Sequence, residues 1–330
     1  MNPSIKQKKE RIKDVKKASN ILIVLCLVVV IFLPTSYAKE DGMLNFLNYM
    51  VETINTGVFE TIEKNLSPSG EDEEINIYDY VTDEDEIKKS VIGTFSNAII
   101  GLGICMMLIY AAMRLFQNLE RGQDELDAIL QFFTEWIFGV ILAINIGKLM
   151  SILVTFGTVV ISAMGDAVKD SPGFEITLQA ITGKEKGGFL WKIQTLFMLF
   201  FPYIASLLLS LVAKFVAYSI LLELGIRRAF APIAIADIFG EGLRSPGVRS
   251  MKKYLAVFFK IAICLLVCKL GNEMISLCGL TPDKAEDVIA AAGNAVTGTF
   301  NYLFSVIVIE FTCVGVMFKG GEYANDVLGV

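Results

Sequence analysis

Long apolar stretches are the feature of this chain that most restricts its fold. A helix needs about 20 mostly apolar residues to cross roughly 30 Å of hydrocarbon, and five stretches approach or exceed that length. Hydrophobic residues make up 54% of the 330 residues and charged residues only 19%, a balance typical of polytopic membrane proteins. We therefore predict an all-α, polytopic integral protein of the cell (inner, cytoplasmic) membrane. The five predicted transmembrane helices cover about 91–113, 128–147, 189–223, 254–270 and 300–318.

The N-terminus has the three parts of a secretory signal peptide, which we predict over residues 1–38. Residues 1–17 are rich in Lys and Arg, and residues 21–33 (ILIVLCLVVVIFL) are apolar. The small-x-small sequence that ends in Ala38 suits cleavage before Lys39. An uncleaved anchor is the alternative, although the apolar run is short for a membrane span.

Residues 39–90 are predicted to lie outside the membrane, before a helical membrane domain over residues 91–330. Between Met43 and Leu66, apolar residues recur every three or four positions, which places them in one stripe on a helix. Because its other faces are polar, this amphipathic helix is expected to lie on the membrane or on a partner, not across the bilayer. Residues 67–86 are acidic and contain Pro and Gly, so we expect a linker with little capacity for a core.

Two of the apolar stretches are longer than a bilayer is thick. As continuous helices, residues 128–164 and 189–223 would be about 55 and about 50 Å long at 1.5 Å per residue. Both excess lengths fall on the outer side in the predicted topology and flank one loop. This predicts a helical hairpin that projects about 20 Å outward from the membrane. The alternative is that residues 147–164 bend down as an interfacial or re-entrant segment.

A basic loop over residues 224–253 sets the predicted orientation. It carries six cations against two anions, so the positive-inside rule places it in the cytoplasm. Five spans then leave the N-terminus of the mature chain outside and the C-terminus in the cytoplasm. Splitting residues 128–164 into two spans would move the loop outside, against that rule. The six cations are Arg227, Arg228, Arg244, Arg249, Lys252 and Lys253.

A short apolar segment inside this loop, Ala229–Ala236, is predicted to form an elbow. As a helix it would be only about 12 Å long, too short to cross the bilayer. Pro232 suits the first turn of a short helix, and Asp237 ends the apolar run. We expect the elbow in or just under the inner leaflet, with loop cations at both ends. These cations act either as topology signals beside anionic lipid or as a docking surface for nucleic acid or an acidic partner.

Four charged residues lie inside the predicted spans, where a charge costs at least about 2.5 kcal/mol on insertion scales. They are Glu135, Lys214, Lys260 and Glu310. One interpretation is a polar lining for a translocation path. The other is structural pairing of Glu135 with Lys214 and of Lys260 with Glu310, or snorkelling of the lysines toward the interface.

The sequence shows no sign of catalytic chemistry. It contains no His, the commonest general base and metal ligand, and no P-loop, HExxH or GxSxG motif. Its six cysteines show no CxxC spacing, and five lie in apolar runs, where free cysteine behaves as a small hydrophobe. We therefore expect no enzyme activity and no catalytic, cofactor-binding or metal-binding residues.

The sequence IRRAFAPIAIADIFGEGLRSPGVRSMKKYLAVFFK resembles the cytoplasmic loop of TrbL-type polytopic subunits, the sixth VirB-class component of conjugative type IV secretion systems, in their Gram-positive form. The resemblance implies a homo-oligomeric channel subunit that helps to pass single-stranded DNA and relaxase across the membrane. Its implied partners are the outer stalk protein, the cytoplasmic ATPases and the coupling protein. The residues that carry the resemblance are Arg227 or Arg228, Phe230, Pro232 to Ala234, Ala236, Asp237, Gly247 and Tyr254 to Val257.

Two other functions remain open from the sequence. A stand-alone secondary transporter or ion channel would be expected to show internal repeats and broken helices near the middle of the membrane. No convincing repeat is visible between the spans. A passive membrane scaffold of an envelope complex would need neither a repeat nor a conduit.

Overall fold

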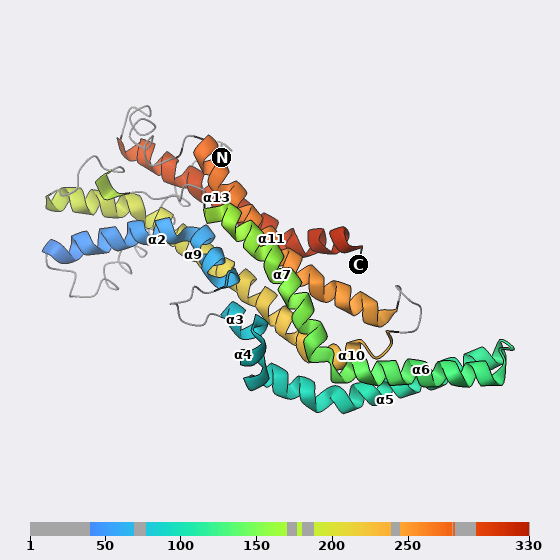
Figure 1. Ribbon diagram of the computed structural model, residues 1–330. Coiled ribbons are helices and arrows are strands. Elements are labelled where there is room, and N and C mark those ends of the chain that lie inside the picture. The colour runs from blue at the N-terminus through green and yellow to red at the C-terminus, as the bar shows by residue number, and fades with distance from the viewer. Residues whose placement is uncertain are drawn as a thin grey trace, which may run out of the picture.

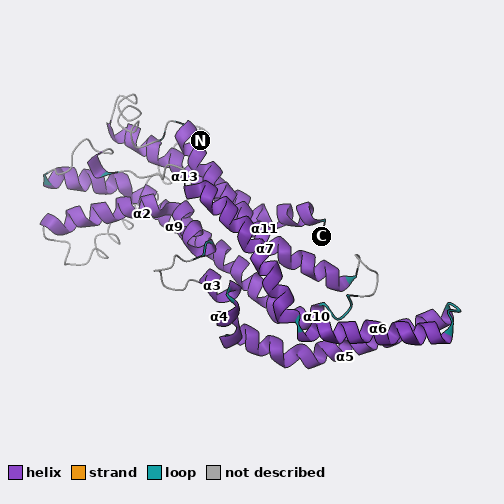
Figure 2. Ribbon diagram, in the orientation of Figure 1, coloured by secondary structure: helices purple, strands orange, loops and turns teal. Residues whose placement is uncertain are grey.

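The computed structural model describes residues 40–68, 77–169, 177–179, 188–238, 245–278, 280 and 295–329. Within these ranges the chain forms helices and turns and no strands (Figure 2), which confirms the all-α prediction. The predicted cleavage site at Ala38 and Lys39 lies outside the described residues. The helices are α2 (Glu40–Leu66), α3 (Ile77–Thr82), α4 (Glu84–Lys89), α5 (Val91–Glu120), α6 (Glu125–Ile144), α7 (Ile146–Lys169), α9 (Phe189–Ala229), α10 (Ala231–Ala234), α11 (Pro246–Leu277) and α13 (Ala295–Leu328).

The helices form an elongated bundle with a hairpin at one end (Figure 1). Within the bundle, α11 packs against α7, α9 and α13, and α13 also packs against α9. This hairpin consists of α5 and α6, which pack against each other as an antiparallel pair joined at residues 121–124. It is called the α5–α6 hairpin below. In Figure 1 this pair extends away from the end of the bundle at which α10 lies.

Among the residues that the structure describes, six helices are long and apolar enough to cross a membrane: α5, α6, α7, α9, α11 and α13. Their surfaces keep many large apolar side chains exposed, such as Phe215 and Leu222 on α9, each 66% exposed. Apolar surface in water is unfavourable by about 25 cal/mol per Å², whereas hydrocarbon removes that penalty. The structure thus supports a multi-pass membrane protein, with six candidate spans where the sequence predicted five.

The additional candidate span arises because the apolar stretch 128–164 is broken at Asn145. α6 ends at Ile144 and α7 begins at Ile146. The Asn145 side chain donates a hydrogen bond to the carbonyl oxygen of Ile141 (2.8 Å), a local bond that competes with continuation of the helix. The prediction of one continuous helix with a straight outward extension is therefore wrong.

The predicted outward hairpin between residues 147–164 and the start of 189–223 is also not formed. α7 packs along α11, where an added Cβ on Gly157 would lie 2.3 Å from the ring of Phe258. The first part of α9 packs against α2 instead. Burial of an apolar helix face against α11 thus decided the direction of α7.

α2 corresponds to the predicted amphipathic helix, and the structure shows what its apolar stripe covers. It runs parallel to α9: Tyr49 contacts Tyr203 with ring centroids 6.4 Å apart, and farther along Ser206 donates to the carbonyl of Thr53 (3.3 Å). α2 also packs against α11, so this helix finds its partner in the same chain. The buried stripe residues are Leu47, Met50, Val51, Ile54, Val58, Ile62 and Leu66.

The second half of the predicted acidic linker is folded. Residues 77–86 form α3 and the first part of α4. The Asp83 carboxylate caps α4 by accepting hydrogen bonds from two N–H groups of its first turn (2.7 and 3.2 Å), the arrangement for which Asp is favoured at an N-cap. The expectation of little capacity for a core is wrong in this part, because α3 packs on α9. The buried side chains here are Tyr78, Val81 and Ile87.

Contacts of α7 with both α4 and the end of α9 conflict with the predicted five-span topology. Ser151 of α7 accepts a long hydrogen bond from Arg228 (3.5 Å) and donates one to Glu84 (3.1 Å). The topology placed Glu84 outside and Arg228 in the cytoplasm, yet groups this close cannot lie on opposite sides of about 30 Å of hydrocarbon. If all six candidate helices cross, α5, α6, α7 and α9 separate residue 90 from the basic loop. An even number of crossings puts both on one side.

We predict that α4 and the basic loop share one side of the membrane. In a cysteine-free background, Lys89→Cys and Lys252→Cys, both at exposed positions, should react with a membrane-impermeant maleimide from the same side. Intact cells and inverted vesicles give the two sides for comparison. Labelling of the two positions from opposite sides would contradict the contact through Ser151 and would support the predicted five-span topology.

Candidate functional site: the elbow and a buried carboxylate

In the structure the elbow covers residues 230–238, follows α9, and packs along α5 of the α5–α6 hairpin (Figure 1). At its start, the rings of Phe230 and Phe95 meet edge to face with centroids 5.2 Å apart. Next, Pro232 approaches the backbone of α5 at Gly103, where an added Cβ would lie 2.5 Å from the Pro232 carbonyl oxygen. A side chain at position 103 would prevent this approach, so the packing requires glycine.

Protein covers most of the apolar surface of the elbow. Ala231, Ile235 and Ala236 are each 5% exposed or less, and Pro232 is also buried. The short α10 packs against α5, α9 and α11. The sequence predicted an elbow held down by lipid, whereas the structure supplies neighbouring helices for these side chains. Its depth relative to a membrane stays a prediction.

An ion network holds the far end of the elbow. The guanidinium of Arg114, on α5, donates hydrogen bonds to Glu135 of α6 (2.9 Å) and to Asp237 of the elbow. These three side chains are 16–21% exposed, so their charges are partly removed from water. Gln131 donates to Glu135 (2.8 Å) and accepts from Asn118 (3.2 Å). One cation therefore ties together two helices and the elbow.

The network gives Glu135 a partner different from the predicted one. Glu135 pairs with Arg114, whereas Lys214 is exposed on α9 and has no ion pair among the residues that the structure describes. The predicted pair Glu135–Lys214 is therefore wrong. A signal for the observed pair was present, because opposite charges on either side of the short loop 121–124 meet when the two helices run antiparallel.

Lys260 also has a partner that the sequence did not predict. Its ammonium lies 3.8 Å from Glu223 and beside Gly321 of α13. Glu223 in addition accepts two hydrogen bonds from Arg227 (3.0 and 2.6 Å). One carboxylate thus serves two cations near the C-terminal end of α9, and the predicted pair Lys260–Glu310 is not formed.

The six loop cations fall into two groups. Arg227 and Arg228 belong to the last turn of α9, where a positive charge interacts favourably with the helix dipole. The others precede or begin α11, and Arg244 among them lies outside the described residues. The second group offers positive charge to lipid head groups or to a partner, so both interpretations of the loop stay open. Its described members, all exposed, are Arg249, Lys252 and Lys253.

The second candidate site surrounds Glu310 of α13, which is only 3% exposed. Its carboxylate faces a break in α2 at Gly57, whose backbone is non-helical (φ 36°, ψ −149°). The Val58 N–H donates to Glu310 Oε1 at 3.5 Å. An added Cβ on Gly57 would lie 2.2 Å from the same oxygen. The carboxylate therefore sits at the N-terminus of the second half of α2, where helix N–H groups favour negative charge.

Two hydroxyl groups donate hydrogen bonds to the backbone carbonyl at this break. The Gly57 carbonyl accepts hydrogen bonds from Ser210 of α9 (2.9 Å) and from Thr61 (2.7 Å). A buried carboxylate beside a discontinuous helix is an arrangement that membrane proteins use to bind a proton or a small cation. The sequence singled out Glu310, but nothing in it pointed to Gly57, because 252 residues separate Val58 from Glu310.

In comparisons with known proteins, no family model, curated protein or solved structure matches the chain.

We predict that Arg114→Ala destabilises the protein by about 1–3 kcal/mol, because Glu135 and Asp237 would remain partly buried without a cation. The apparent thermal unfolding temperature in detergent is the measurement. Lys89→Ala, which removes an exposed pair with Glu86, should change that temperature little. Equal effects of the two substitutions would show that the network contributes no more than a surface ion pair.

We also predict that Gly57→Ala lowers the unfolding temperature, because alanine would be strained at positive φ and would collide with Glu310. The expected decrease in the free energy of unfolding is about 1–3 kcal/mol. Gly101→Ala is the matched control, since an added Cβ there meets nothing within 4 Å and alanine favours helix. In the double variant Gly57→Ala/Glu310→Ala the collision is absent. Its decrease in the free energy of unfolding should therefore be smaller than the sum of the decreases in the two single variants. Strictly additive losses would contradict the contact.

Proposed function

We propose that this protein is a channel or scaffold subunit of a conjugative type IV secretion system, of the TrbL type, in the cell membrane. One observation carries the proposal: the residues of the family resemblance occupy defined packing positions. Phe230, Pro232 and Asp237 make three successive contacts along α5. A loop that acted only as a topology signal would need its charges but not these contacts. The apolar surfaces of the long helices are consistent with a multi-pass subunit.

In this proposal the elbow is the joint between the hairpin and the bundle. The hairpin exposes large apolar side chains on both helices, including Phe116 (65%) and Phe138 (59%). Such a surface is suited to lipid and to neighbouring subunits of a homo-oligomer. Several copies together would line or brace the path of single-stranded DNA and its attached relaxase, and the outer stalk protein would assemble on them.

The exposed cations at the start of α11 are the proposed contact for the cytoplasmic ATPases and the coupling protein. Arg249, Lys252 and Lys253 lie within two turns of one helix. Clustered positive charge of this kind accelerates and orients the association with an acidic surface. In this role the subunit holds the cytoplasmic proteins in position at the membrane, and its side chains do not take part in a chemical reaction.

A secondary transporter or ion channel is the second candidate, and the buried carboxylate at the break in α2 favours it. Transporters place discontinuous helices and intramembrane acids at their ion sites. Solute or ion flux through the purified protein in vesicles, reduced by Glu310→Gln and independent of other secretion subunits, would support this candidate. A passive scaffold would show neither flux nor contact with transferred DNA.

We predict that deletion of the gene in a conjugative donor abolishes DNA transfer and that the wild-type gene restores it. Gly103→Leu should fail to restore transfer, because the side chain would displace Pro232 from α5. Gly101→Leu, two residues away and facing open space, should restore it. Transconjugants per donor are counted, and the amount of subunit in the membrane is measured alongside.

Unchanged transfer after deletion would overturn the proposal. Crosslinking of DNA during transfer separates the two roles of the subunit. Crosslinks to α9 or α13 would indicate a conduit, whereas loss of transfer without any crosslink would indicate a scaffold.

A further inference from the structure

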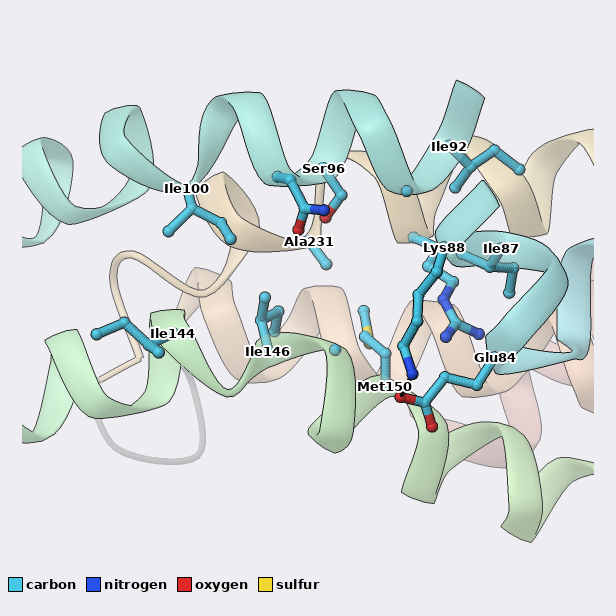
Figure 3. Close-up of a pocket in the computed structure, with 14 residues that line it drawn as sticks. Glu84, Ile87, Lys88, Ile92, Ser96, Ile100, Ile144, Ile146, Met150 and Ala231 are labelled. Carbon is cyan, nitrogen blue, oxygen red and sulfur yellow. Dashed lines mark ion pairs between the residues drawn. The ribbon is translucent and has the colours of Figure 1, made fainter. Parts of the chain in front are cut away.

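A cavity of about 150 Å³ lies beside the elbow, where α4, α5, α7 and α9 meet (Figure 3). Figure 3 shows Lys88 and Glu84 paired at one end and Ile100 and Ile144 at the other. The cavity is therefore polar at one end and apolar at the opposite end. A space of this size holds several water molecules or one tetrahedral anion.

Arg228 is the cavity residue that most needs a partner. It is only 5% exposed, and its Nη2 makes a long contact of 3.5 Å with Ser151 Oγ. Its Nη1 has no hydrogen-bond partner among the described residues. A guanidinium removed from water without acceptors is strongly unfavourable, so this arrangement calls for an acceptor in the cavity.

The carboxylate in the cavity wall does not supply that acceptor. Glu84 accepts hydrogen bonds from Lys88 (2.9 Å) and from Ser151 (3.1 Å), and these bonds lower the pKa of Glu84. The lining contains two cations, Arg228 and Lys88, against this one anion. The wall thus carries one excess positive charge.

Two buried tyrosines lie near Arg228 but do not line the cavity. The Tyr254 hydroxyl interacts electrostatically with Arg228, and the Tyr78 hydroxyl does so with Tyr254. The Tyr78 hydroxyl has no hydrogen-bond partner within the described ranges. Burial raises the pKa of Tyr78 well above its ordinary value, so this hydroxyl keeps its proton and remains a donor. The cationic donors that line the cavity are therefore Arg228 and Lys88.

We propose that this cavity binds a phosphate-class oxyanion through Arg228 and Lys88. A phosphate presents several oxygens to a planar guanidinium, which binds it with paired hydrogen bonds, and its charge offsets the excess positive charge of the wall. The phosphate comes either from the head group of an anionic phospholipid or from free phosphate. This proposal does not depend on the secretion function.

The test titrates the purified full-length protein in detergent with vesicles of dioleoylphosphatidylglycerol or with inorganic phosphate, at constant ionic strength. We expect at least one probe to raise the apparent unfolding temperature. Arg228→Gln should weaken the apparent affinity about tenfold or more, the loss of one charge-assisted contact. Arg227→Gln is the matched control, because the neighbouring side chain pairs with Glu223 outside the cavity lining.

A second variant guards against misfolding of Arg228→Gln. Lys88 has a side chain that is 62% exposed, so Lys88→Gln should fold normally and still weaken binding. A response to the lipid alone identifies the head group as the source, and a response to inorganic phosphate as well identifies a general phosphate site. If neither probe shifts the unfolding temperature, or if Lys88→Gln and Arg228→Gln respond like wild type, water satisfies these donors and the proposal is wrong.

Discussion

The contact of Pro232 with the backbone of α5 at Gly103 is the constraint on which the arrangement of this protein depends. It brings the elbow against the hairpin along a line that Phe230 begins and Asp237 ends. Because the elbow directly continues α9 and precedes α11, the same contact sets how the hairpin meets the bundle. The conflict with the predicted sidedness has the same origin, since this packing brings the start of α5 to the end of α9.

The pairing of partly buried charges explains the other contacts among the elbow, the α5–α6 hairpin and the bundle. A partly buried charge is tolerated only when a counter-charge and hydrogen bonds are close by, and each of the pairs seen obeys this rule. Arg114 serves two carboxylates, and Glu223 serves two cations. Glu310 is different, because it meets a backbone N–H and not a cation. Where such pairing is incomplete, as at Arg228, the structure indicates a site for a ligand.

The class of fold was predictable because it depends on sums over many residues. Apolar length predicts membrane helices, and the spacing of apolar residues in α2 predicted both the helix and its buried stripe. The helix break at Asn145 was not predictable in this way, because a single side-chain hydrogen bond decided it. The short helices α3 and α4 were also missed. Their few apolar residues are a weak signal until α9 is present to cover them.

The sequence by itself determined the helical class, the apolar faces, and the presence of an elbow too short to cross a membrane. It also singled out Glu135, Lys260 and Glu310 as charges that need partners. Only the tertiary structure decided which partners they meet. A charge interacts over a few ångströms in space, whereas periodicity reports only on neighbours along one helix. The partner of Glu310, at the other end of the chain, therefore became visible only when α2 and α13 packed together.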